Sequence, residues 1–263
     1  MIAIIISLLL FALAVYLFIL FIIKRDRGNR EPIEALFIAM GFGLAAVIAA
    51  FFLNHYLLPG DIETIANPAS NQQFSSLYIL MISMGVGLIE ETVKIVPLAL
   101  FIYKKKYFNE LTDGIIYFGV TALTFGIVED ISYMINLGGG VGISRILLSP
   151  YLHAAFTILF GLALAYKKIL NKSWWLVFAG YLSAIVAHGL YDFFIFSRSP
   201  AGTILSIITA LFSSAVLFIL FRKAQIDDEK SGQSAKGINK FCRHCGKPNP
   251  KRLLYCSFCG KLS

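Results

Sequence analysis

The sequence is poor in charge: only 14% of its 263 residues are Asp, Glu, Lys or Arg, against about 25% in an average soluble domain. Hydrophobic residues make up 58% of the chain, and the mean hydropathy is +0.76. A chain of this size cannot bury so much apolar surface in one soluble core. The scarcity of charge therefore excludes a soluble globular enzyme and a disordered protein. We expect an all-α polytopic membrane protein.

Cysteine is absent before position 242, which excludes a secreted disulfide scaffold. The four cysteines instead form two Cys-x-x-Cys-Gly pairs separated by ten residues. They are Cys242, Cys245, Cys256 and Cys259. This spacing is typical of tetrahedral thiolate coordination of zinc, and a site with all four ligands supplied by cysteine is structural rather than catalytic. The sequence thus predicts a zinc ribbon over residues 241–263, connected by a flexible linker over 222–240.

Seven stretches are long and apolar enough to cross a bilayer, which takes about 20 residues. They cover Ile2–Ile23, Ile33–Leu58, Ser76–Tyr103, Asp113–Ile135, Ile146–Tyr166, Trp174–Phe196 and Ala201–Phe221. The N-terminal stretch lacks the charged start and the cleavage site of a signal peptide, so we expect it to remain as a span. Together these stretches predict a transmembrane domain over residues 1–221.

Basic residues alternate along the predicted loops. The first, third and fifth loops and the C-terminal tail are rich in Lys and Arg, the second has none, and the fourth and sixth have only Arg145 and Arg198. The positive-inside rule then places the N-terminus outside the cell membrane and the C-terminus in the cytoplasm. The net charge of +8 is thereby explained by topology, and we expect no nucleic-acid partner. The ribbon would face an unknown cytosolic partner.

Ionisable residues gather in four consecutive predicted spans, although each costs roughly 2.5–3.5 kcal/mol to insert and so marks a functional site. They are Glu90, Glu91, Lys94, Glu129, Asp130, His153, His188 and Asp192. At about 1.5 Å per helical residue, most of these acids and imidazoles lie at nearly one depth, in the middle to outer half of the bilayer. We therefore expect one shared polar site.

Helical spacing predicts pairs within this cluster. Lys94 is three residues from Glu91 and four from Glu90, so it shares a helix face with both. We expect one of the two glutamates to pair with Lys94 while the other faces the cavity. His188 and Asp192 are four residues apart, so the carboxylate can orient the imidazole.

Two chemistries suit such a cluster. A glutamate can act as the general base that activates water while histidines stabilise the oxyanion, or Glu and His together can ligate a divalent metal. The His-Glu-x-x-His zinc-protease motif is absent. A different class stays open, since midmembrane titratable groups also build proton-coupled transporters or noncatalytic scaffolds. Two adjacent Glu with two His favour water activation over a conduction path.

Four motifs in order resemble those of the PrsW family of intramembrane proteases. Residues 90–94, Glu-Glu-Thr-Val-Lys, resemble its EExxK motif, and Phe125 with Glu129 occupies FxxxE positions. The segments that contain His153 and 188–192 resemble the third and fourth motifs. The resemblance covers about residues 76–196. It implies a helical bundle whose active site lies within the membrane.

The resemblance also implies roles for single residues. It makes Glu90 or Glu91 the general base, and it places Glu129, His188 and His153 as groups that position water or stabilise the transition state. The related CAAX prenyl proteases have His at the position of Glu129.

The same resemblance adds Asp192 to the catalytic set, with Lys94 and Phe125 as supporting residues. The CAAX prenyl proteases have Asn at the position of Asp192. The substrate that the resemblance to the PrsW family implies is a membrane-anchored protein in the lipid bilayer, such as an anti-sigma factor cleaved on its extracytoplasmic side. A structural zinc ion in the ribbon is the expected cofactor, and a catalytic metal is not expected, although a Glu and His site leaves it open.

Overall fold

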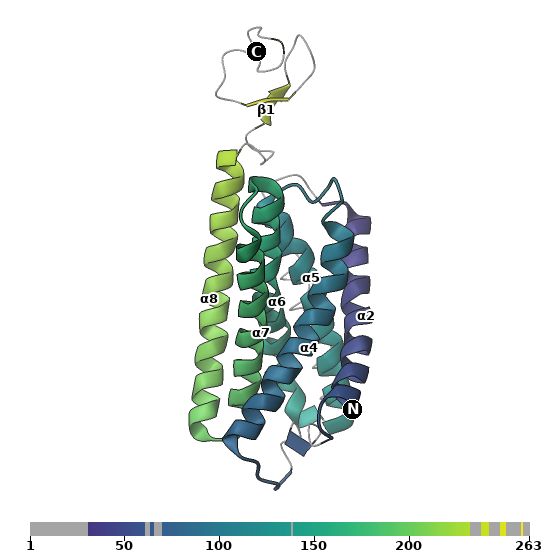
Figure 1. Cartoon of the computed structure of the whole chain (residues 1–263), viewed down its shortest axis with the longest axis vertical. Coiled ribbons are helices and arrows are strands. Elements are labelled where there is room, and N and C mark those ends of the chain that lie inside the picture. Colours follow the sequence, from purple (N-terminus) through teal and green to yellow (C-terminus); the bar gives the residue numbers. More distant parts are fainter. Residues whose placement is uncertain are drawn as a thin grey trace.

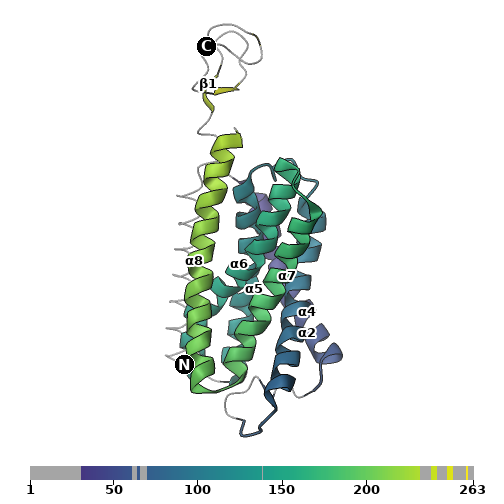
Figure 2. The same cartoon turned by 60° about the vertical axis from the view of Figure 1, so that its left-hand side comes forward.

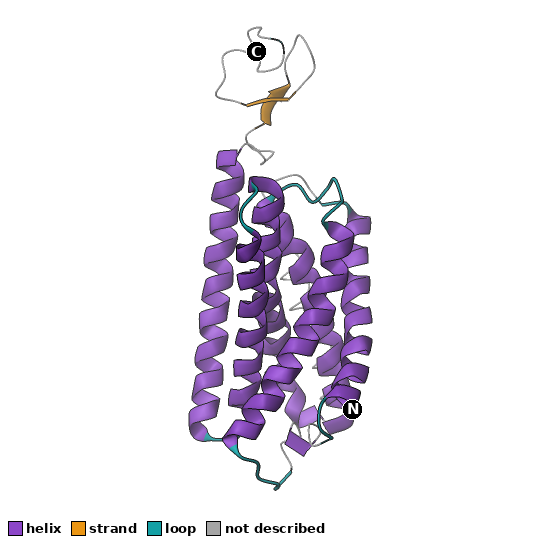
Figure 3. Ribbon diagram, viewed as in Figure 1, coloured by secondary structure: helices purple, strands orange, loops and turns teal. Residues whose placement is uncertain are grey.

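The computed structural model describes residues 31–60, 64–65, 70–137, 139–231, 238–241, 248–250 and 259. Within them, six long helices run side by side along one axis, and the loops lie at the two ends of the bundle (Figures 1 and 3). The helices are α2 (Ile33–Leu57), α4 (Ser76–Ile102), α5 (Leu111–Leu137), α6 (Gly139–Leu170), α7 (Trp174–Phe196) and α8 (Pro200–Ser231).

Helix α2 shows which surface faces lipid. Its buried positions are all small: Ala35, Ala39, Gly43, Ala46 and Ala50. Its exposed positions include large apolar residues such as Phe37, Leu44, Ile48 and Phe51. This arrangement is the inverse of that in a soluble protein, because small residues let membrane helices approach closely while large apolar ones contact lipid tails. The distribution agrees with a membrane-embedded bundle.

Five of the described helices are long and apolar enough to cross a membrane: α2, 111–133 of α5, 149–170 of α6, α7 and α8. Helix α4 has 27 residues but carries Glu90, Glu91 and Lys94 near its middle, and all three are buried within the bundle. The expected all-α, multi-pass architecture is confirmed. The first predicted span, Ile2–Ile23, lies outside the described residues.

The interior of the bundle is formed mainly by α5 and α6, whereas α2 and α8 turn most of their surface outward (Figures 1 and 2). Both interior helices are longer than predicted. Helix α5 begins two residues before the predicted Asp113, and α6 begins at Gly139 rather than Ile146. The Asp113 carboxylate accepts hydrogen bonds from the backbone N–H groups of Asn109 and Glu110 at 2.6 and 2.7 Å, which holds the turn that precedes α5.

Helix α8 also runs ten residues past its predicted end at Phe221, so the first part of the predicted linker is helical as far as Ser231. The reason is a tertiary contact. The buried Asp228 carboxylate accepts hydrogen bonds from the backbone N–H groups of Leu111 at 2.7 Å and Thr112 at 3.0 Å. The first N–H groups of a helix have no acceptor within that helix, and a negative charge is favoured near them. The carboxylate of Asp228 therefore supplies the acceptor that the start of α5 lacks.

Beyond α8, two short strands pair antiparallel (Figure 1): β1 (Ile238–Phe241) and β2 (Pro248–Pro250). Of the four predicted zinc ligands, Cys242, Cys245 and Cys256 lie outside the described residues, and Cys259 is exposed. The zinc ribbon over 241–263 therefore stays a prediction.

Replacing Asp228 by Ala is expected to destabilise the bundle by about 1–2 kcal/mol, because the first backbone N–H groups of α5 lose their buried acceptor. Thermal unfolding in detergent measures the loss as a lower Tm. The exposed neighbour Glu229, replaced by Ala, is the control and should leave Tm unchanged. Equal Tm values for both variants would show that the α8 extension does not stabilise α5.

Candidate active site

Two glycines bring α4 and α7 into close contact beside the polar cluster. A Cβ atom at Gly87 would lie 2.9 Å from both the backbone nitrogen of Gly189 and the backbone oxygen of Ile185. Only hydrogen side chains allow this approach. It sets the adjacent glutamates of α4 against His188 of α7, so the backbone contact positions the site.

The Glu91 carboxylate is the centre of the cluster. Its Oε1 atom lies 2.5 Å from Lys94 Nζ and 2.8 Å from His188 Nδ1, and its Oε2 atom accepts a hydrogen bond from the Thr157 hydroxyl at 2.7 Å. All four side chains are buried. Both oxygens of Glu91 are therefore engaged, which confirms the expected pair with Lys94 and shows which of the two glutamates forms it.

His153 lies between a carboxylate and an ammonium group. Its Nε2 atom is 2.8 Å from Glu129 Oε2, and its Nδ1 atom is 3.1 Å from Lys94 Nζ. Because the ammonium group can only donate, Nδ1 accepts, and Nε2 then carries the proton that is donated to Glu129. Lys94 also lies 4.4 Å from the centre of the Phe125 ring, which is a cation–π contact between the two residues that were expected to support the site.

Glu90 is engaged differently from its neighbour. Its Oε1 atom accepts a hydrogen bond from Asn54 Nδ2 at 3.4 Å. Its Oε2 atom is buried without a hydrogen-bond partner among the described residues and lies 3.6 Å from His188 Nε2. The same His188 nitrogen is 3.5 Å from Asp192 Oδ2. One oxygen of Glu90 thus stays available next to an imidazole nitrogen.

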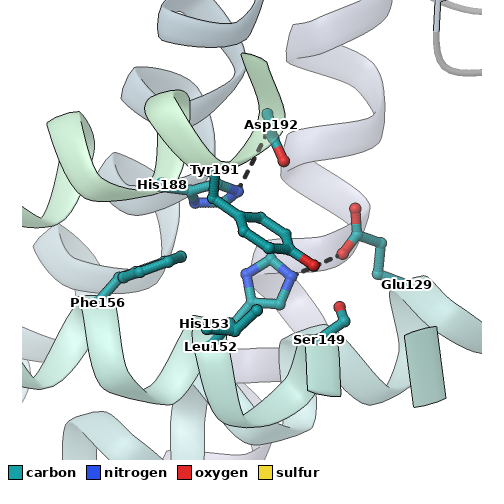
Figure 4. A pocket seen from close by; sticks show the side chains of 8 residues that line it. All are labelled: Glu129, Ser149, Leu152, His153, Phe156, His188, Tyr191 and Asp192. Carbon is teal, nitrogen blue, oxygen red and sulfur yellow. Dashed lines mark hydrogen bonds and ion pairs between the residues drawn. The ribbon is translucent and has the colours of Figure 1, made fainter. Parts of the chain in front are cut away.

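A small pocket lies beside these groups, between side chains of α5, α6 and α7 (Figure 4). Its lining combines carboxylates and imidazoles with apolar walls. The lining residues are Glu129, Ser149, Leu152, His153, Phe156, His188, Tyr191 and Asp192. The view shows Glu129, His153, His188 and Asp192 meeting around the same space, so a group that enters the pocket would contact the polar cluster directly.

All the intramembrane residues expected from the sequence to act or support therefore meet at one place: Glu90, Glu91, Lys94, Phe125, Glu129, His153, His188 and Asp192. Two members of the cluster were not predicted. Thr157 lies four residues after His153 on α6, so helical spacing could have indicated it. Asn54 lies on α2, and nothing but its polarity in an apolar helix marks it.

One donor atom each of Glu90, His153 and His188 lies within 4.8 Å of the others, which is the arrangement of a possible metal site. Imidazole and carboxylate are the donor types that suit zinc.

These features define a class: a multi-pass helical membrane protein with a buried site of paired glutamates and histidines. Residues 31–221 match a known family, the PrsW family of intramembrane metalloproteases. The chain therefore belongs to the PrsW family and is an intramembrane peptidase. The matched region begins before the four motifs, and it includes α2 and the part of α8 up to Phe221.

Named relatives agree with this assignment. Protease PrsW of Geobacillus kaustophilus is 27% identical over 202 residues, which cover 76% of this chain and 83% of that protein. Protease PrsW of Clostridioides difficile is 31% identical over 194 residues, 70% of this chain and 77% of the relative. The Bacillus subtilis protein of the same name is 26% identical over 178 residues, 66% and 76% of the two chains. No solved structure matches at a significant level.

Replacing Gly87 by Ala is expected to lower stability by about 1–3 kcal/mol and to lower activity, because the new methyl group must push α7 away from α4. Thermal unfolding in detergent and cleavage of a membrane substrate measure the two effects. Gly41, with open space around it, is the matched control: its replacement by Ala should leave activity unchanged and not lower Tm. A normal Gly87→Ala variant would contradict the role of this contact.

Proposed function

We propose that this peptidase hydrolyses a peptide bond in a membrane-anchored protein by means of a water molecule activated by Glu90. The observation that carries the proposal is the difference between the two adjacent glutamates. Glu91 is engaged at both oxygens, whereas Glu90 keeps Oε2 without a hydrogen-bond partner among the described residues, 3.6 Å from His188 Nε2. A general base needs such an accessible lone pair within reach of the water.

In the proposed reaction, Glu90 takes one proton from water while the water oxygen attacks the scissile carbonyl carbon. His188, doubly protonated between the carboxylates of Glu91 at Nδ1 and Asp192 at Nε2, then stabilises the oxyanion through its Nε2–H group. The proton held by Glu90 passes to the leaving amine as the C–N bond breaks. His153, oriented by Glu129, lines the same pocket and helps to position the water.

Glu91 has a supporting role in this scheme. Its contacts with Lys94 and Thr157 fix the carboxylate, and the fixed carboxylate holds Nδ1 of His188 as a donor. This leaves Nε2 of His188 directed toward Glu90 and Asp192. Glu91 thus acts through the imidazole rather than on the water, in the way that outer groups orient an active histidine.

A catalytic metal fits the hydrogen bonds of the site poorly. Glu90 and His188 could each offer a ligand atom, but both nitrogens of His153 are engaged, one with Glu129 and one with Lys94. A divalent cation would also meet repulsion from the ammonium group of Lys94. The proposed reaction therefore uses no metal-bound step, although the donor types alone would suit zinc.

The substrate we propose is a single-span membrane protein such as an anti-sigma factor, cleaved in the outer half of the bilayer. The distribution of Lys and Arg supports an orientation with the N-terminus outside and the C-terminal ribbon in the cytoplasm. The loop between α2 and α4 then lies outside. Arg198, which lies between α7 and α8, donates hydrogen bonds to the backbone oxygens of Thr64 and Ile65 in this loop at 2.9 and 2.7 Å, so the two connections lie at the same end of the bundle.

Glu90→Gln and His188→Ala are each expected to lower the cleavage rate by at least about 100-fold, because the first removes the base and the second the group that stabilises the oxyanion. Purified protein in lipid, incubated with single-span reporter proteins, gives the initial rates on gels. Glu34→Gln, the same change at an exposed position of α2, is the control and should cleave normally. Cleavage at the normal rate by both site variants would refute the assigned roles.

Chelation is expected to leave cleavage unchanged, because no step depends on a bound metal. The assay adds a strong chelator to wild-type protein and to a full-length variant in which Cys242, Cys245, Cys256 and Cys259 are Ser. The variant separates the ribbon from the membrane site. Equal loss of cleavage in both proteins would show that the Glu and His cluster binds an essential metal.

A further inference from the structure

Asn54 is the residue of α2 that forms a hydrogen bond with Glu90, the first of the two adjacent glutamates of α4. It lies outside the four motifs. Its side chain is half-buried one turn before the end of an otherwise largely apolar helix. Its Nδ2 atom donates the hydrogen bond to Glu90 Oε1 at 3.4 Å. A carboxylate only accepts hydrogen bonds, so the amide must present nitrogen, not oxygen, to Glu90.

The other half of the Asn54 amide has no evident structural purpose. Its Oδ1 atom is buried without a hydrogen-bond partner among the described residues. A buried acceptor left unpaired costs about 1–3 kcal/mol, and an apolar residue of the same size would avoid this cost within a membrane. The amide is therefore poorly explained by stability and better explained by its contact with Glu90.

The position of Asn54 is fixed by the packing of α2 on α5. Ala46 and Ala50 of α2 pack against Phe125 of α5, and the Thr121 hydroxyl donates a hydrogen bond to the backbone oxygen of Ala39 at 2.9 Å. Because Phe125 also contacts Lys94, α2 is tied to the helix face that holds the cluster. The Asn54 amide is thus held at a set place relative to Glu90.

We propose that Asn54 is a positioning residue for Glu90: its amide N–H holds Oε1 so that Oε2 stays directed to the reacting water. This inference rests on the proposed function. Without the amide, Glu90 could rotate onto His188 Nε2, which already lies 3.6 Å from Oε2, and form a closed pair. That pair would occupy both the base and the group that stabilises the oxyanion. Asn54 therefore keeps the two groups separate.

The test measures kcat and KM of the full chain in lipid, with a single-span reporter. Asn54→Leu is expected to lower kcat about 10–100-fold with KM within about twofold, the usual effect of losing an outer group that orients an active side chain. Asn54→Gln, which restores an amide, is expected to recover most of the loss. His55→Leu, an exposed neighbour on the same turn, is the matched control and should be normal. Tm in the same lipid shows that each variant is folded.

Three results would overturn the inference: an unchanged kcat in Asn54→Leu, a raised KM with unchanged kcat, or an Asn54→Gln variant as slow as Asn54→Leu. Glu90→Gln is assayed beside them. If wild type cleaves and Glu90→Gln does not, while Asn54→Leu is normal, only the role of Asn54 fails. If Glu90→Gln cleaves normally, or wild type cleaves no reporter, the proposed function fails and the inference fails with it.

Discussion

The buried carboxylate of Glu91 is the interaction on which the rest of the site depends. It joins three helices through Lys94 of α4, Thr157 of α6 and His188 of α7. Charges removed from water are costly unless each is paired and hydrogen-bonded, and here both oxygens are satisfied. Because Glu91 takes these donors, Glu90 is left with an unpaired oxygen. One pair of adjacent residues thereby supplies both a structural carboxylate and a chemically available one.

Small residues make this arrangement possible. Gly87 and Gly189 bring α4 and α7 into backbone contact, and Gly126 leaves room for His153, whose ring would otherwise lie 2.7 Å from a Cβ atom. Lipid provides no hydrophobic force between helices, so close packing and hydrogen bonds between helices hold a membrane bundle together. The polar cluster therefore joins the helices at the same place where we propose the active site. This accounts for three charged residues in the middle of α4.

The outer helices contribute more than lipid contact. Helix α2 brings Asn54 to Glu90, and the end of α8 brings Asp228 to the start of α5, the helix that also carries Glu129. Helix α2 lies within residues 31–221, which match the PrsW family, as does α8 as far as Phe221, whereas Asp228 lies beyond the match. The helices that hold the polar cluster in place thus include α2 and α8 as well as those that carry the four motifs, because α4 and α5 form hydrogen bonds with residues of α2 and α8.

Hydropathy and helical periodicity act along the chain, so the sequence alone predicted the described long helices, a pair between Lys94 and one of the two adjacent glutamates, and the pair His188–Asp192. Those features depend only on the geometry of single helices. Which glutamate stays available was decided by tertiary structure, because the donors to Glu91 come from other helices. The contact of Asn54 with Glu90 and the extension of α8 to Ser231 were decided in the same way. The spacing of residues along one helix follows from its own sequence, whereas the residues that it contacts on other helices depend on how the helices pack.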